Sequence, residues 1–221
     1  VLTVAIEEVE IIQNSAGLYN EVVAHRLGLI PLTTDLESYT LPEGDDISAM
    51  NSVALTLNAD NTGYIYAKDL VTKDPKIKPA FDDMAITYLL EGQNIELNAT
   101  AVMGQGKNHQ KWCPANIYYS YKPDIKVNNR SGKLSEVIEK YPPQVVKDGK
   151  IDASAISTPA LIDACDCVCP EVVSIEYDPT GFVFGVESFG QLSATDILAE
   201  AVMQFNAQLD ELKGLLKDLK N

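Results

Sequence analysis

The chain is poor in the residues that most often mark catalytic and metal sites. Among its 221 residues it has two histidines, four cysteines and one tryptophan. Neither His25 nor His109 has a serine or cysteine beside it in the setting of an activated nucleophile, and Cys113 is near His109 only in sequence. We therefore predict no catalytic residues.

Long apolar runs and a signal peptide are also missing. No run approaches the roughly 20 apolar residues of a membrane-spanning helix. The first twelve residues carry three glutamates and lack a basic segment. Four cysteines are too few for a disulfide scaffold and fit a reducing compartment. We expect a soluble, cytoplasmic protein with no membrane partner.

Basic residues are scarce, with 17 against 32 acidic residues and a net charge of -15. Such a surface repels phosphate backbones, so direct nucleic-acid binding is not expected. Two explanations of the charge stay open: solubility in a salty cytoplasm, or acidic faces that meet basic partner subunits.

The apolar pattern predicts mixed α and β structure. An alternating stretch through Val4, Ile6, Val9 and Ile11 opens the chain without methionine and resembles a strand whose neighbour lies upstream, so we expect an N-terminal piece to precede it. Residues 19–32 have helical spacing that ends at a glycine and a proline.

Residues 53–103 read as two β-hairpins. The first joins 53–57 to 64–66 through a turn at 61–63, and the second joins 86–90 to 95–102 through a turn at 91–92. Residues 125–171 have little periodicity and a faint internal repeat, in which Tyr141-Pro142 and the valines that follow echo Cys169-Pro170 and its valines. They form a separate insert.

A long C-terminal helix carries one apolar stripe. Ser193 and Asp196 resemble a capping box at its start. The stripe has heptad spacing and consists of Leu198, Val202, Phe205, Leu209, Leu212, Leu216 and Leu219. These residues, called the seam below, either pack on the protein's own sheet or meet a second chain.

A glycine-rich segment, Gly104 to His109, invites comparison with nucleotide-binding loops. A dinucleotide fingerprint needs a third glycine where His109 stands, and a phosphate loop needs a Gly-Lys-Ser/Thr ending. We favour a structural turn, with Trp112 anchoring the loop.

Three cysteines, Cys165, Cys167 and Cys169, resemble the end of a ferredoxin cysteine run. Pro159 and Ile162 stand where earlier thiolates would be. If the stretch is extended, the three sulfurs share a face but are one short of four. We predict that the insert folds without iron and assign no cofactor. Tyr141 then fills the space of a cluster.

Three segments together resemble one family, that of the D subunits of archaeal RNA polymerases and the related third-largest subunits of eukaryotic polymerases. Residues 21–32 match its E-x-x-A-H-R-L-G-L-I-P-L segment, and residues 104–114 and 186–192 resemble two further family segments. The matched positions are His25, Arg26, Gly28, Pro31, Gly104, Gly106, His109, Lys111, Trp112, Pro114, Glu187, Ser188 and Gly190. The family's opening strand and first helix would precede Val1.

The resemblance implies an α+β protein in three parts: a two-part dimerisation domain (residues 1–36 and 174–221), an inserted β-rich domain (37–124) and a ferredoxin-like insert (125–173). It implies a non-catalytic assembly subunit of DNA-directed RNA polymerase that forms a heterodimer with subunit L, onto which subunits N and P and the large catalytic subunits assemble. The alternatives are an iron–sulfur redox or sensor protein and a free-standing enzyme.

Overall fold

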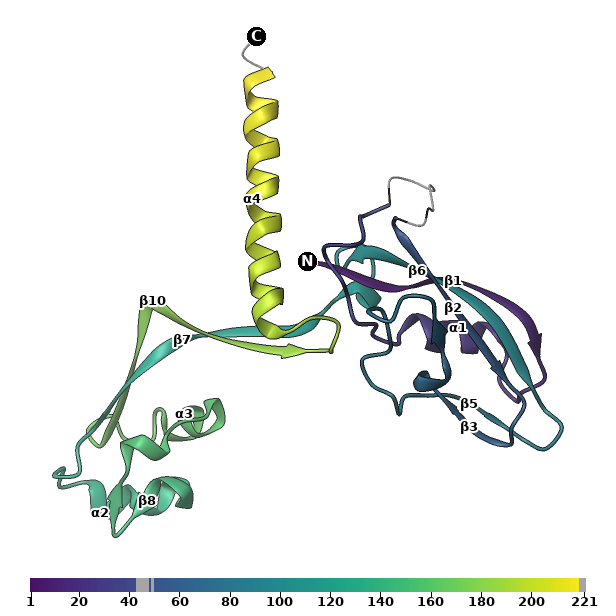
Figure 1. Ribbon diagram of the computed structural model, residues 1–221. Helices are drawn as coiled ribbons and strands as arrows, with labels where there is room; N and C mark the ends of the chain where they lie inside the picture. The colour runs from purple at the N-terminus through teal and green to yellow at the C-terminus, as the bar shows by residue number, and fades with distance from the viewer. Residues whose placement is uncertain (43–47, 49, 219–221) are drawn as a thin grey trace. The chain divides into compact units, whose positions relative to one another are not determined.

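The computed structural model describes residues 1–42, 48 and 50–218. Contacts divide the chain into two compact units (Figure 1). Unit 1 comprises Val1–Asn116 and Val186–Asn221, and unit 2 comprises Ile117–Gly185. Antiparallel sheets and helices together make this an α+β protein.

A four-stranded antiparallel sheet forms the centre of unit 1. Its strand order is β1 (Leu2–Asn14), β6 (Ile95–Gln105), β2 (Ser52–Ala59) and β4 (Val71–Thr72). We expected the opening strand to pair with an upstream neighbour, but its described partner is β6, far downstream. This pairing also joins the two sides of the predicted boundary at residue 36. The predicted division into a dimerisation domain, a β-rich domain and a ferredoxin-like insert is defined by the roles of the parts, and it stays a prediction.

Both predicted hairpins are wrong. β2 pairs with β6 and β4, while β3 (Gly63–Tyr66) pairs with β5 (Ala85–Leu89) in a sheet of their own. Alternation in β2 correctly places Val53, Leu55 and Leu57 on the buried face. Alternation fixes the face of a strand, however, and does not identify its partner.

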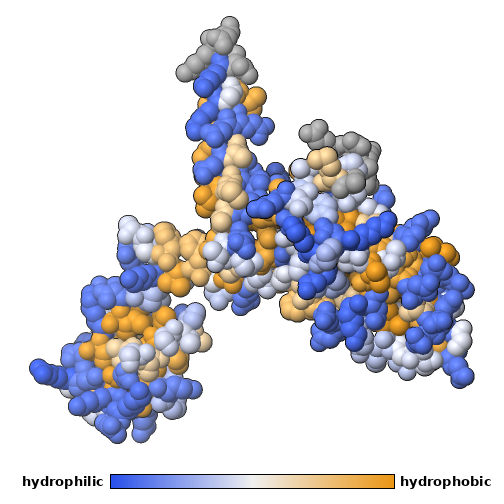
Figure 2. Space-filling view, in the orientation of Figure 1, coloured by the Kyte–Doolittle hydropathy of each residue, from blue (hydrophilic) through white to orange (hydrophobic). Residues whose placement is uncertain are grey.

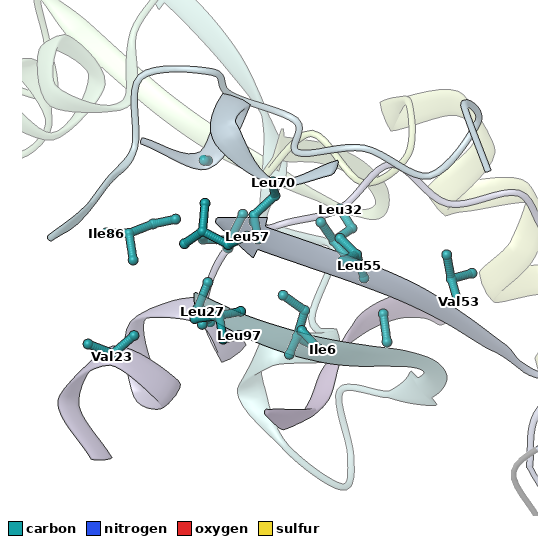
Figure 3. Packing of buried hydrophobic residues seen from close by; sticks show 14 of the residues in the cluster. Ile6, Val23, Leu27, Leu32, Val53, Leu55, Leu57, Leu70, Ile86 and Leu97 are labelled. Atoms are coloured by element: carbon teal, nitrogen blue, oxygen red, sulfur yellow. The ribbon is translucent and has the colours of Figure 1, made fainter. Parts of the chain in front are cut away.

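The core of unit 1 lies between the sheet and α1 (Asn20–Gly28), which ends at the predicted glycine. Val23 and Leu27, four residues apart on one side of the helix, are fully buried. In the close view, side chains from α1, β1, β2 and β6 meet there (Figure 3). Two short 3-10 helices, η1 (Ala67–Asp69) and η2 (Gln110–Trp112), complete this part.

The chain enters unit 2 along β7 (Ala115–Val127) and returns to unit 1 along β10 (Val173–Ser188), and these two long strands pair with each other. Between them lie α2 (Leu134–Val137), η3 (Ile138–Lys140), η4 (Pro143–Val145), β8 (Val146–Lys147), β9 (Lys150–Ile151), η5 (Ala153–Ala155) and α3 (Pro159–Cys165). This segment has a second, separate hydrophobic core.

The chain ends in α4 (Ala194–Asp218). The Ser193 hydroxyl accepts the Asp196 backbone N–H at 3.1 Å and donates to the Asp196 carboxylate at 2.6 Å, which confirms the predicted serine cap. Ile197 and Glu200 in the first turns are buried. In the described part of the chain, no helix is long and apolar enough to cross a membrane.

Candidate interaction site

The three motif segments, far apart in sequence, line one cavity of about 380 Å³ in unit 1. The segment that ends α1, the segment around η2 and the turn before α4 all contribute, together with residues that precede β5. The lining consists of Leu29, Pro31, Phe81, Met84, Gln110, Lys111, Cys113, Ser188, Phe189 and Gln191.

The first motif segment is tied to the strand region that follows it. Arg26 donates from Nη1 to the backbone oxygen of Ile86 at 2.8 Å. The Pro31 oxygen accepts the backbone N–H of Ala80, also at 2.8 Å. His25 is exposed. These bonds hold the end of α1 beside β5 and the residues that precede it.

The second segment is packed against the sheet by Trp112, which is buried. Its indole N–H donates to the Val102 oxygen at 3.2 Å, and the Thr3 hydroxyl donates to the Trp112 oxygen at 2.7 Å. A Cβ placed on Gly104 would lie 2.3 Å from the indole ring, so only glycine leaves room for it. The predicted anchoring role of Trp112 is confirmed.

The polar side chains of the second segment form their hydrogen bonds and ion pair with other residues of this chain. Nδ1 of His109 accepts the Lys111 backbone N–H at 3.1 Å, so His109 caps η2. Lys111 Nζ forms an ion pair with Glu7 and donates to the Ile6 oxygen at 3.0 Å. Gly106 passes close to Cys113: a Cβ there would lie 3.2 Å from the Cys113 Cα.

The third segment is a tight turn around Gly190. Its φ of +95° is in the region that favours glycine, and a Cβ there would lie 2.7 Å from the Ala80 Cβ. The Ser188 hydroxyl accepts the Gly190 N–H at 3.0 Å and donates to the Leu192 oxygen at 2.6 Å. Glu187 is exposed and accepts a 3.4 Å hydrogen bond from Asn116.

Gln191 connects the third segment to the second segment and to Thr34, which lies two residues beyond the first segment. Its side-chain amide donates to the backbone oxygens of Lys111 and Cys113 at 3.4 and 3.3 Å, and its own backbone oxygen accepts the Thr34 N–H at 2.9 Å. Phe189, just before Gly190, donates its backbone N–H to the oxygen of the buried Pro114 at 2.8 Å. The side-chain Oε1 of Gln191 is buried and has no hydrogen-bond partner among the described residues.

The chemistry of this cavity is that of a binding surface. The charged side chain in its lining, Lys111, is paired with Glu7, and the Cys113 thiol donates to the Ala115 oxygen at 3.3 Å. The other lining side chains are apolar or already hydrogen-bonded, except for Gln191 Oε1 and the exposed side-chain amide of Gln110. Such a lining accommodates an apolar group with a small number of polar contacts.

A second hollow, of about 570 Å³, lies where α4 begins and contains an ionic network. Lys76 pairs with Asp35 at 2.6 Å, and hydrogen bonds from Lys76, Ser38 and the Glu37 backbone hold the pKa of Asp35 far below its usual range. Beside this network, the Tyr39 hydroxyl donates to Asp74 at 2.6 Å. Burial, with the hydrogen bond to Asp74, raises the pKa of Tyr39 to about 12.

The seam of α4 is not covered by the chain itself. The six described seam residues range from 38% exposed at Leu209 to 61% at Phe205, and Figure 2 shows apolar atoms along this helix. Leu219, the seventh, lies outside the described residues. The alternative in which the seam packs on the protein's own sheet does not hold for the described part of α4.

The cysteines do not fit an iron–sulfur cluster. Cys165 and Cys169 are buried in the second core beside Tyr141, whose hydroxyl donates to the Cys169 oxygen at 3.5 Å. Cys167 is exposed and has a φ of +62°, so the stretch is not extended and the three sulfurs do not share a strand face. No group of three metal-binding side chains occurs among the residues that the structure describes. Burial raises the pKa of the Cys165 thiol, which disfavours the thiolate that binds metal.

Similarity to known proteins agrees with this architecture. The family described as the RNA polymerase Rpb3/RpoA insert domain matches residues 6–115. DNA-directed RNA polymerase subunit Rpo3 of Thermococcus kodakarensis is 36% identical over 90% of this chain and 78% of its own length. The chain belongs to the Rpo3 family of RNA polymerase subunits.

Other Rpo3 proteins match over similar lengths. The protein of Methanobrevibacter smithii is 31% identical over 94% of this chain and 82% of its own length. That of Pyrococcus furiosus is 31% identical over 98% of this chain and 84% of its own length. The family resemblance carried by the three motif segments is therefore confirmed, and this Rpo3-family chain is a subunit of a transcription enzyme.

Sequence reasoning did not find two features of this Rpo3-family chain. One is the cavity, because Phe81, Met84 and Gln191 belong to no recognisable pattern. The other is an exposed aromatic cluster on β7 and β10, in which ring centroids lie 5.2 to 6.5 Å apart. It consists of Tyr119, Tyr121, Phe182 and Phe184. Aromatic residues at alternate positions in two strands were the signal that could have found it.

Proposed function

We propose that this chain is a non-catalytic assembly subunit of a cytoplasmic archaeal RNA polymerase and that it forms a heterodimer with subunit L through the seam of α4. The observation that carries the proposal is the exposure of this regularly spaced apolar stripe on a helix whose first turns are anchored in unit 1. A leucine that becomes buried contributes about 1.5–3 kcal/mol. The six described seam residues, four leucines with Val202 and Phe205, together strongly favour a helix partner.

Subunits N and P and the large catalytic subunits would then assemble on this heterodimer. The motif segments support a scaffold role, since their conspicuous polar residues, Arg26, His109 and Lys111, bond to the chain's own backbone or to Glu7. The buried cysteine pair and Tyr141 give no support to the alternative of an iron–sulfur redox protein.

The test is recovery of the full-length subunit from cells through an affinity tag. We expect subunit L and the other polymerase subunits to co-elute in fixed ratio. Co-expression with subunit L alone should give a heterodimer of one copy each. Recovery of the tagged chain alone, or in a complex without polymerase subunits, would show that the proposal is wrong.

A further inference from the structure

The cavity lined by the three motif segments has the features of a docking socket rather than of a gap in the packing. Leu29, Phe81 and Phe189 line it and are 44%, 49% and 37% exposed. Exposed apolar side chains gathered around a hollow mark sites of protein interaction, where an inserted side chain is shielded from water.

One buried polar atom of a residue that lines the socket lacks a hydrogen-bond partner among the described residues. Both amide donor bonds of Gln191 go to carbonyl oxygens, so exchanging the positions of its nitrogen and oxygen would not satisfy the side chain. Gln191 is only 4% exposed, and its Oε1 is left without a donor among the described residues. Buried oxygens are nearly always hydrogen-bonded, so the occupant of the socket should bring a donor.

Three acidic residues flank the lining of the socket in sequence, and one exposed cation, Lys68, lies beside two of them, since its backbone N–H donates to the Asp82 oxygen at 3.2 Å. Asp82 and Asp83 stand between two lining residues, and Glu187 precedes a third; all three are exposed and form no salt bridge among the described residues. Lys111, the cation in the lining, is already paired with Glu7. Uncompensated carboxylates favour a basic partner.

We infer that the socket receives a basic segment of another polymerase subunit, which inserts an apolar side chain and brings an N–H donor for Gln191. This inference rests on the proposed function and names the surface through which the heterodimer takes up a further subunit. The occupant is distinct from subunit L, which is assigned to the α4 seam.

Cys113 provides a reporter, because it lines the socket and is partly exposed. In a Cys167→Ser background, the remaining cysteines Cys165 and Cys169 are buried. We expect N-ethylmaleimide to modify Cys113 in the heterodimer with subunit L and to do so at least about tenfold more slowly in the assembled polymerase, as for a residue in a desolvated contact. Equal rates in the two states would overturn the inference, as would a thiol already protected in the isolated full-length subunit, because the chain would then fill its own socket.

A substitution provides the second arm. Leu29→Glu adds a carboxylate at the exposed rim and should weaken uptake of further subunits by about tenfold or more while heterodimer formation continues. Leu90→Glu, at an exposed leucine outside the lining, is the matched control and should assemble normally. Equal assembly of the two variants would refute the socket. Failure of the unmodified chain to join any polymerase would instead refute the proposed function.

Discussion

At the scale of single residues, the glycines of the motif segments act through the space they leave. The indole of Trp112 occupies the position that a Gly104 side chain would take, and its hydrogen bond to Val102 prevents the ring from moving aside. A loop that resembles a nucleotide-binding sequence is thereby explained as a packing device.

Gly104→Ala should therefore lower the free energy of unfolding by about 1–3 kcal/mol, the usual cost of overpacking a core. Chemical denaturation monitored by tryptophan fluorescence measures this, since the protein has one tryptophan. Gly17→Ala is the control, because a Cβ there has no heavy atom within 4 Å. If the two variants are equally stable, the indole does not constrain Gly104.

A second prediction at the scale of single residues concerns how the contribution of Asp35 to stability changes at acidic pH. The folded protein lowers the pKa of Asp35 through its bonds with Lys76, Ser38 and the Glu37 backbone. A carboxyl with a lower pKa in the folded state stabilises the protein above the unfolded pKa, about 3.9, and this contribution is lost as the pH falls further.

Asp35→Asn should thus lower the thermal midpoint near neutral pH, and the difference from the unmodified protein should shrink below about pH 4. Melting curves at a series of pH values provide the measurement. A difference that stays constant or grows in acid would mean that Asp35 contributes in some way other than through its charge.

At the scale of elements, α4 combines an anchored start with an exposed seam. Leu212→Asp with Leu216→Asp should abolish co-purification with subunit L, because two carboxylates would have to be buried at the helix contact. Ala207→Asp with Gly214→Asp adds the same charge on the opposite side of α4 and should leave binding intact. Size-exclusion chromatography of the co-expressed pair distinguishes these outcomes, and binding by the seam variant with unchanged affinity would place the contact elsewhere.

The insert in unit 2 has a core of its own. Val145, Val172 and Val173 are buried, Val146 is half-buried, and Tyr141 packs among the cysteines. The protein expressed anaerobically with iron and sulfide should contain no stoichiometric iron and show no visible absorbance. About four irons per chain would contradict this prediction, since that is the content of a four-thiolate cluster.

These elements also show what the sequence could and could not predict. Local signals succeeded: the Ser193 cap, the end of α1 at Gly28 and the buried face of β2 all follow from neighbouring residues. The prediction of strand partners failed, because β2 and β3 are adjacent in sequence but belong to different sheets. The socket was also missed, since its residues come from four segments that only the folded chain brings together.

At the scale of the whole molecule, the net charge of -15 had two explanations that a rate measurement separates. If acidic faces meet basic subunits, association of the heterodimer with the remaining subunits should slow markedly as salt rises toward about 0.5 M, because screening removes electrostatic steering. Stopped-flow mixing provides the measurement. A rate that does not depend on salt would leave solubility as the role of the charge.

The strand order of the main sheet also has a consequence for synthesis on the ribosome. β1 is made long before its partner β6: Glu10 and Asn98, bonded across the two strands, are 88 residues apart, and Thr3 and Trp112 are 109 apart. β2 is likewise completed before β6 and pairs along its length with it. Such long-range pairing is slow to form, and unpaired strands invite aggregation. The nascent chain can therefore first pair β1 and β2 into one sheet when β6 emerges. Until then, chaperones or rapid synthesis would have to keep β1 and β2 from aggregating.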